Sequence, residues 1–363
     1  MEYVRLGKTN LLVSRTSFGA LPIQRISDYN EAAQLIRQAY DGGINFFDTA
    51  RAYTDSEKKL GIALKDIRKN VIISTKTAAK TAQALKSDLE TSLSELNTDY
   101  IDIYQLHYPQ TVPKSGQPDG IYEALLEAKK EGKIRFIGIT NHSRIQALDA
   151  ALSGLYDTVQ YPFSMLSSQE EIDLVKFCDQ LNIGFIAMKA LCGGMLTNIP
   201  LAFGFLRQFE NVVPIWGIQK KEELSQILYF EANPPRVDDK FMEEVENERK
   251  NLSFDFCRGC GYCMPCPAEI PIDFANRMIQ LLRRAPTKSY LTPEWKEKME
   301  RINNCISCKE CEKRCPYHLK PYETLPLHLK DYLQMYSEMN KSSEVIFCHG
   351  FLYVSNFLTC KNS

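Results

Sequence analysis

The stretch that decides the fold of this chain is VIISTKTAAKTAQALKSDLETSLSELNTDYIDIYQLH, residues 71–107. It opens with a short apolar, β-branched run, Val71–Lys76, and continues with an amphipathic helical pattern over Ala82–Leu96. A second apolar run, Ile101–His107, follows. A helix between two strands returns the chain to the edge where the first strand began, so the two strands run parallel. The segment therefore predicts one βαβ unit of a parallel sheet.

The same alternation extends in both directions along the chain. Further strands are predicted at Thr16–Ala20, Ile44–Asp48, Ile134–Thr140, Asp157–Tyr161, Gly184–Met188 and Val212–Trp216. Helical patterns lie between them at Asn30–Asp41, Ile121–Glu131, Ser143–Ser153, Ser168–Leu181 and Lys221–Ala232. Eight such units close most readily into a (β/α)8 TIM barrel. We therefore predict an α/β fold with this barrel over residues 1–252, and a small hairpin at Met1–Val13 covering its bottom.

Composition and charge exclude several classes of protein. The 363 residues carry 44 Lys plus Arg against 45 Asp plus Glu, a net charge of −1, which argues against a nucleic-acid partner or an anionic membrane surface. The opening residues MEYVRLGKTN lack the apolar core of a secretory signal. No apolar run reaches the ~18 residues of a membrane span. We expect a cytoplasmic protein with no membrane span.

The cysteines are concentrated in two groups near the C-terminus. Of 12 in the chain, eight lie in the patterns Cys257-x2-Cys260-x2-Cys263-x2-Cys266-Pro267 and Cys305-x2-Cys308-x2-Cys311-x3-Cys315-Pro316. In a reducing compartment such cysteines bind metal rather than form disulfides. This is the spacing of bacterial ferredoxins, in which the fourth cysteine of each group ligates the other cluster. The first group departs from it by one residue, with x2 rather than x3 before its last cysteine.

We therefore predict two [4Fe-4S] clusters in a small, α-rich, ferredoxin-like domain over residues 253–336. By the ferredoxin rule, one cluster takes Cys257, Cys260, Cys263 and Cys315, and the other takes Cys305, Cys308, Cys311 and Cys266. Two zinc ions are the alternative, because paired CxxC motifs also form zinc ribbons. Short helices are expected at Asp238–Lys250, Asp273–Arg284 and Pro293–Ile302, and residues 337–363 have no assignment.

Four chemically active residues lie at or just after the carboxyl ends of three successive predicted strands of the barrel. Asp48, Lys76 and His107 end their strands, and Tyr53 lies in the loop after the first. Reactive groups of TIM barrels lie at the carboxyl ends of strands, so these four can meet in one pocket. Carbonyl reduction needs a proton donor at the oxygen. We expect the Lys76 ammonium, held by Asp48, to lower the pKa of Tyr53, and a neutral His107 to orient the carbonyl.

The motifs around these residues, DTARAY, STK and QLH, resemble the aldo-keto reductase superfamily, whose catalytic tetrad is Asp, Tyr, Lys and His. The resemblance implies hydride transfer from a nicotinamide cofactor bound in extended form, and no GxGxxG motif follows a strand here. It also implies cofactor contacts by position. They are the carboxamide ligands Asn141 and Gln160, the stacking position Met188, the pyrophosphate loop with Leu191 and Gly193, and the adenosine-phosphate loop with Gln219 and Lys220.

Two of these positions differ from what the family resemblance leads us to expect, the nicotinamide-stacking position and the adenosine-phosphate loop. Met188 replaces the usual tyrosine and offers a weaker platform. Lys220 and Lys221 can pair with a 2′-phosphate, whereas Glu222 and Glu223 oppose one. NADP is expected because the superfamily uses it, with NAD as the other possibility.

The barrel motifs together with CGYCMPCP, residues 260–267, resemble a branch of aldo-keto reductases that carry a C-terminal 4Fe-4S dicluster domain. This implies an oxidoreductase acting on a small-molecule aldehyde or ketone. The alternative is a nicotinamide-binding redox sensor or electron-transfer protein in which the clusters are the working part, with a redox partner protein. Hydride carries two electrons and a cluster accepts one, so the clusters can be structural, sensing or electron-transferring.

Overall fold

The structure is a computed structural model that describes residues 1–252, 257–284 and 290–355, with side chains described to residue 338 except at 251, 280, 283 and 284. The chain divides into two compact units. The first comprises Met1–Leu191 and Asn198–Asn251, and the second comprises Cys192–Thr197 and the residues from Leu252 onward. The prediction had placed Cys192–Thr197 with the barrel.

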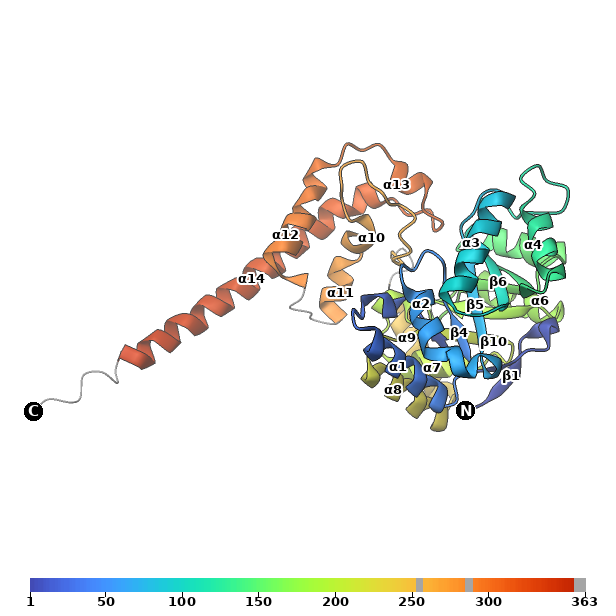
Figure 1. The fold of residues 1–363 in the computed structure, drawn as a ribbon. Coiled ribbons are helices and arrows are strands. Elements are labelled where there is room, and N and C mark those ends of the chain that lie inside the picture. Colours follow the sequence, from blue (N-terminus) through green and yellow to red (C-terminus); the bar gives the residue numbers. More distant parts are fainter. Residues whose placement is uncertain (253–256, 285–289, 356–363) are drawn as a thin grey trace, which may run out of the picture. The chain divides into compact units, whose positions relative to one another are not determined.

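Eight parallel strands of the first unit close into a barrel, in which β10 pairs with both β9 and β3 (Figure 1). The strands are β3 Ser17–Gly19, β4 Phe46–Asp48, β5 Ile72–Thr77, β6 Ile101–His107, β7 Ile134–Thr140, β8 Thr158–Pro162, β9 Gly184–Met188 and β10 Val212–Gly217. All eight fall where the apolar runs predicted them, and the predicted (β/α)8 fold is confirmed.

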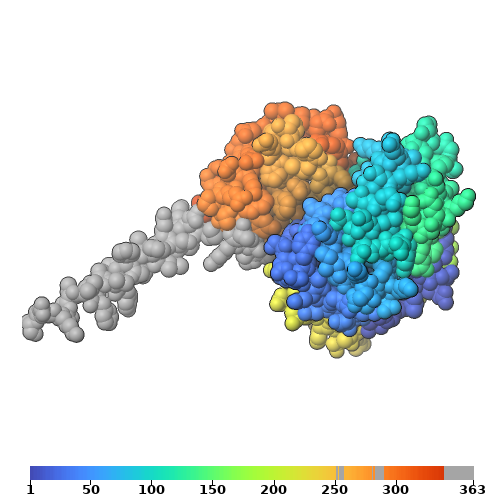
Figure 2. Space-filling model, in the orientation of Figure 1, coloured from blue at the N-terminus to red at the C-terminus, as the bar shows by residue number. Residues whose placement is uncertain are grey.

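Nine helices of the first unit follow or accompany these strands (Figure 1). They are α1 Tyr29–Asp41, α2 Ser56–Leu64, α3 Ala82–Glu95, α4 Ile121–Lys130, α5 Arg144–Ser153, α6 Gln169–Gln180, α7 Ile199–Arg207, α8 Lys221–Ala232 and α9 Asp239–Asn251. The side of the barrel unit visible in Figure 2 is mostly blue to green, from the first half of the chain, with yellow residues along its lower edge. The strands lie inside this covering, as the burial of almost every strand residue requires.

The sequence did not predict α2 and α7. In α7 nearly every position is apolar and six consecutive residues are buried, so the sequence shows a continuous apolar run, from which a helix cannot be told from a buried strand. In α2, Gly61 weakens the helical pattern. Glycine is required there because a Cβ at Gly61 would lie 2.3 Å from the carbonyl oxygen of Glu95.

An N-terminal hairpin covers one end of the barrel, as predicted. Its strands β1 Tyr3–Arg5 and β2 Leu12–Ser14 pair antiparallel around a short helical turn, η1 Gly7–Thr9. Leu6, Leu11 and Val13 pack against apolar residues from the amino-terminal halves of the barrel strands, which are Phe46, Ile72, Ile103, Ile186 and Val213. The opposite, carboxyl end of the strands is therefore the end that carries Asp48, Lys76 and His107.

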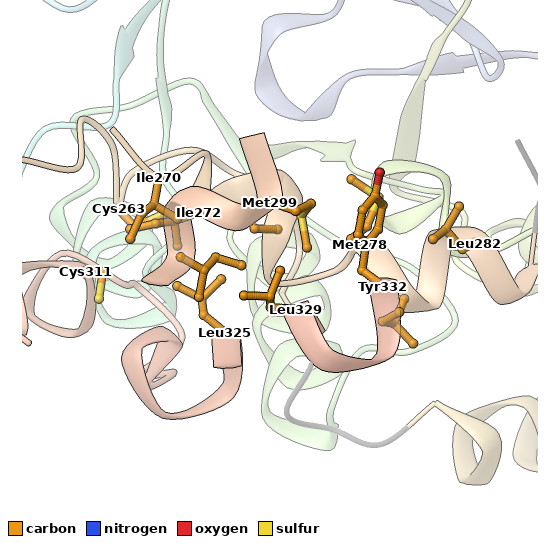
Figure 3. Close-up of a cluster of buried hydrophobic side chains, with 13 residues drawn as sticks. Cys263, Ile270, Ile272, Met278, Leu282, Met299, Cys311, Leu325, Leu329 and Tyr332 are labelled. Carbon is orange, nitrogen blue, oxygen red and sulfur yellow. The ribbon is translucent and has the colours of Figure 1, made fainter. Parts of the chain in front are cut away.

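The second unit is helical and has its own core. It contains α10 Ile272–Ala275, α11 Met278–Arg284, α12 Pro293–Glu300, η6 Arg301–Asn304, α13 Glu310–Lys313 and α14 Pro321–Ser355. The first half of α14 packs against the shorter helices through Leu325, Leu329 and Tyr332 (Figure 3). Two cysteines, Cys263 and Cys311, belong to this core.

Two elements of the second unit differ from expectation. The single helix expected over Asp273–Arg284 is divided at Asn276 and Arg277. Helix α14 continues to Ser355, past residue 336, where we expected the domain to end. Among the residues that the structure describes, no helix is both long enough and apolar enough to cross a bilayer.

Candidate active site and metal centres

Three neighbouring strands and one turn position the four predicted catalytic residues. Asp48 is the last residue of β4, Lys76 lies one residue before the end of β5, and His107 ends β6. Tyr53 lies in the turn between β4 and α2. Because β4, β5 and β6 are adjacent and parallel, their carboxyl ends lie side by side.

Asp48 and Lys76 form a buried ion pair. The Lys76 Nζ lies 2.5 Å from Asp48 Oδ2, and the two side chains are 1% and 2% exposed. Nζ also donates to the carbonyl oxygen of Thr49 at 2.6 Å. Burial raises the pKa of the Asp48 carboxyl and lowers the pKa of the Lys76 ammonium, while the contact between the two opposes both shifts. The pair therefore places a compensated positive charge in a dry site.

Tyr53 and His107 lie beside this ion pair. Their rings meet edge to face with centroids 5.9 Å apart, and Lys76 Nζ lies 5.4 Å from the centroid of the Tyr53 ring. Burial, followed by the negative charge of Asp48, raises the pKa of Tyr53. The expected lowering of this pKa by Lys76 is wrong, because burial and the charge of Asp48 both raise it. Burial, followed by Lys76, lowers the pKa of His107 to about 3, so its imidazole is neutral at neutral pH.

Gln105 is a buried member of this site that the sequence reading missed. Its Nε2 donates to Ser74 Oγ at 2.7 Å and to Gln160 Oε1 at 2.7 Å, and lies 3.2 Å from Asp48 Oδ1. It precedes His107 by two residues on β6, and residues two apart on a strand share a face. That spacing was the signal that could have revealed it.

The predicted carboxamide ligands have partners within the barrel. Asn141 Nδ2 donates to the carbonyl oxygen of Pro109 at 2.9 Å, and Oδ1 accepts from the Ser143 N–H at 2.8 Å. Gln160 joins the Gln105 and Asp48 network. Asn141 therefore fixes the loop after β6, and Gln160 lies next to the ion pair.

The remaining predicted cofactor residues lie at the end of β9 and in the segments that follow β9 and β10. The Met188 sulfur accepts from Thr140 Oγ1 at 3.7 Å. Leu191 ends the first part of the barrel unit, whereas Gly193 belongs to the second unit. The N–H groups of Gln219 and Lys220 both donate to Glu223 Oε2, at 2.8 and 3.1 Å. Glu223 thus places a carboxylate at the start of α8.

The eight cysteines surround two separate cavities in the second unit. One cavity is lined by Cys257, Cys260, Cys263 and Cys315. The other is lined by Cys266, Cys305, Cys308 and Cys311. Each cavity takes three cysteines from one group and the fourth from the other, which is the cross-ligated arrangement of ferredoxins. Ile272 lines both cavities.

The spacing of these thiols fits clusters better than single ions. Among the described residues, no three Cys, His, Asp or Glu side chains converge as closely as one metal ion requires. A zinc ion would need its four ligands within about 2.3 Å of one point. Thiols that line a cavity could each bind one iron of a polynuclear iron–sulfur cluster, which would occupy the space between them.

The fold and the site define the class of this protein, a TIM-barrel oxidoreductase with an iron–sulfur domain. The aldo/keto reductase family model matches residues 17–211, and a 4Fe-4S dicluster domain model matches residues 256–320. The first match covers more than half of the chain, and the chain belongs to the aldo/keto reductase family.

Individual relatives match the barrel. The chain is 33% identical over 218 residues to the aldo-keto reductase YhdN of Bacillus subtilis, covering 54% of this chain and 64% of that protein. It is 30% identical over 228 residues to the NADH-specific methylglyoxal reductase of Escherichia coli, covering 54% and 70%. A solved putative aldo-keto reductase from Pseudomonas aeruginosa is 25% identical, with a TM-score of 0.57 and coverage of 64% and 95%.

Proposed function

We propose that the barrel reduces an aldehyde or ketone with hydride from NADPH or NADH, and that Tyr53 is the general acid. The observation that carries this proposal is the buried Asp48–Lys76 ion pair beside the rings of Tyr53 and His107. An uncharged acid, a fixed cation and a neutral imidazole are the groups that carbonyl reduction needs.

The protonation states support these roles. A bound nicotinamide supplies the hydride, which adds to the carbonyl carbon and leaves negative charge on the oxygen. Tyr53 keeps its proton at neutral pH because burial raises its pKa, so it can donate that proton to the oxygen. The Lys76 ammonium then stabilises the tyrosinate, and Asp48 keeps the ammonium in place. Neutral His107 has one N–H with which to hold the carbonyl.

Both nicotinamide nucleotides belong in the test. The superfamily suggests NADP, while Glu223 at the start of α8 disfavours a 2′-phosphate. The E. coli relative is an NADH-specific methylglyoxal reductase. A 2-oxoaldehyde is therefore the first substrate to include in a panel of small aldehydes and ketones.

Replacement of Tyr53 tests the mechanism. Tyr53→Phe is expected to lower kcat for carbonyl reduction by about 10²–10⁴-fold, the typical contribution of a positioned general acid. Nucleotide affinity, followed by protein fluorescence, should be unchanged. Tyr229→Phe is the matched control, because Tyr229 is 60% exposed on α8. Undiminished turnover in Tyr53→Phe would overturn the assignment of the acid.

We further propose that the second unit holds two [4Fe-4S] clusters with exchanged fourth ligands. Protein purified without oxygen should contain about eight iron and eight acid-labile sulfide per chain, and no zinc. Colourless, zinc-loaded protein would contradict this proposal.

Pairs of cysteine replacements test the exchange of ligands. Cys257→Ala with Cys315→Ala should lose no more iron than either change alone, because both remove ligands of one cluster. Cys257→Ala with Cys266→Ala should lose both clusters. Cys178→Ala, in the barrel, is the control that should keep full iron content. The reverse pattern would show that each group supplies all four ligands of its own cluster.

A second function, electron exchange with a redox partner protein, is favoured by Cys308. Of the eight cysteines, all of which the structure describes, Cys308 alone is exposed, so a cluster bound there would lie near solvent. Reduction of a one-electron acceptor by NADPH, without carbonyl turnover in anaerobic protein, would favour this function over the reductase.

A further inference from the structure

Arg277 is a buried cation in the second unit. It lies in the short non-helical connection between α10 and α11. Its side chain is 8% exposed. Nε donates to the carbonyl oxygen of Asp273 at 2.9 Å and Nη1 to that of Gly193 at 2.8 Å. Among the described residues it has no carboxylate partner within ion-pair distance. A buried charge normally requires a compensating charge, so another anion is expected near this guanidinium.

The first cysteine group supplies the site for that anion. A Cβ on Gly259, which lies between Cys257 and Cys260, would be 2.4 Å from Arg277 Cζ. Gly259 also donates its N–H toward the Cys257 sulfur at 3.4 Å. The guanidinium thus packs on the loop that lines the first cavity, where four thiolates and a cluster would carry net negative charge.

The other partner of Arg277 belongs to the segment Cys192–Thr197. A Cβ on Gly193 would lie 2.5 Å from Arg277 Nη1, so both contact points of the guanidinium are glycines with positive φ, 68° at Gly193 and 61° at Gly259. The segment joins β9 to α7 along the chain and belongs to the second unit. It contains Gly193, which the family resemblance assigns to the nucleotide pyrophosphate.

We propose that Arg277 couples the charge of the first iron–sulfur cluster to the conformation of the segment Cys192–Thr197, and through that segment to nucleotide binding. The nucleotide part rests on the proposed function. One electron from an external one-electron donor adds one negative charge to the cluster, and no bond is made or broken. The added charge attracts the guanidinium and weakens its hydrogen bond to Gly193. The oxidised protein therefore holds the segment more firmly and binds nucleotide more tightly.

Thermodynamic linkage also determines the direction in which nucleotide binding shifts the reduction potential of the cluster. A ligand that prefers the oxidised protein stabilises that state, so it lowers the reduction potential of the cluster. A tenfold preference corresponds to about 59 mV for a one-electron couple. Arg277 is a positioning residue in this scheme, since it acts through the segment and the cluster.

Hydrogen exchange of a peptide covering residues 192–197 tests the coupling without nucleotide. In anaerobic holoprotein, dithionite reduction is expected to speed exchange of this peptide several-fold. Arg277→Gln should exchange rapidly in both redox states, and Arg277→Lys, which keeps the charge, should restore part of the difference. Arg314→Gln is the matched control, because Arg314 bonds the carbonyl oxygens of Met264 and Pro265 instead. Equal exchange in oxidised and reduced wild type would overturn the proposal.

Redox titrations followed by electron paramagnetic resonance, with and without saturating NADP+ or NAD+, test the nucleotide part. Wild type is expected to show a potential lowered by about 59 mV with nucleotide, for a tenfold preference, and Arg277→Gln no such shift. The full shift in Arg277→Gln would overturn the role of Arg277. Redox-dependent exchange in wild type without any nucleotide binding would support the coupling and contradict the proposed function alone.

Discussion

Replacing Lys76 by methionine tests whether the centre of the site is an ion pair. Lys76→Met removes the ammonium that lies 2.5 Å from Asp48 Oδ2 and leaves a 2% exposed carboxylate without its cation. Removing one partner of a buried pair costs about 3–5 kcal/mol. Asp48→Asn makes the converse change, since it leaves the ammonium with the Thr49 carbonyl oxygen.

The double variant, Lys76→Met with Asp48→Asn, measures the interaction free energy between the two charges. Removing both charges avoids an uncompensated ion, and replacement of a whole buried pair is often neutral. The destabilisation of the double variant is therefore expected to fall short of the sum of the single variants by about 3 kcal/mol. Lys76→Met alone should also depend on pH, because burial raises the pKa of Asp48 with no cation to oppose it. The folded variant then binds the extra proton, so stability falls as pH rises, by at most about 1.4 kcal/mol per pH unit.

Urea unfolding followed by tryptophan fluorescence measures these free energies. The chain contains two tryptophans, one in each unit, so a Trp295→Phe background leaves Trp216 on β10 to report on the barrel. Trp216 is 2% exposed and stacks on Phe203, which makes it sensitive to loss of the core. Additive free energies in the double variant, or no pH dependence in Lys76→Met relative to wild type, would refute a charged pair.

Three further predictions follow from the same structure. Because burial lowers the pKa of His107 to about 3 and raises that of Tyr53, kcat/KM for reduction should stay constant from about pH 5 to about pH 9, and a loss centred near pH 6.5 would contradict a neutral His107. Gln105→Leu should destabilise the barrel by about 1–3 kcal/mol in the same urea assay, because Asp48 and Gln160 lose a buried donor, and an unchanged unfolding midpoint would show that these contacts are dispensable. Iron release to a chelator should proceed in two phases, and the cluster bound by exposed Cys308 should lose its iron first. Cys308→Ala should therefore remove the fast phase, and retention of that phase would contradict the assignment of Cys308 to the faster cluster.

The strands could be predicted from the sequence because each barrel strand is a short apolar run bounded by turns. The predicted strand Ile134–Thr140, for example, has the same bounds in the structure. Helix α7 could not be predicted, because its continuous apolar run does not distinguish a helix from a buried strand. Cross-ligation is predicted from the cysteine spacing, and each cavity is lined by three cysteines of one group and the fourth of the other.

Other features depend on distances that only the folded chain has. The pKa of Tyr53 rises because the ring is buried, and burial of one side chain is a property of the whole barrel. Arg277, which lies between α10 and α11, donates to the carbonyl oxygen of Gly193, 84 residues earlier in the chain. No local pattern in the sequence encodes that contact.

The most direct measurement of the central claim follows the origin of the new hydrogen in the product. NADPH or NADH deuterated at the transferring position of the nicotinamide is incubated with the anaerobic holoprotein and a carbonyl substrate, and the alcohol is analysed by mass spectrometry. Hydride transfer in the barrel predicts one deuterium on the carbinol carbon for each nucleotide oxidised. Product that carries only solvent hydrogen at that carbon would show that the electrons travel another way, through the clusters, and would contradict the proposed function.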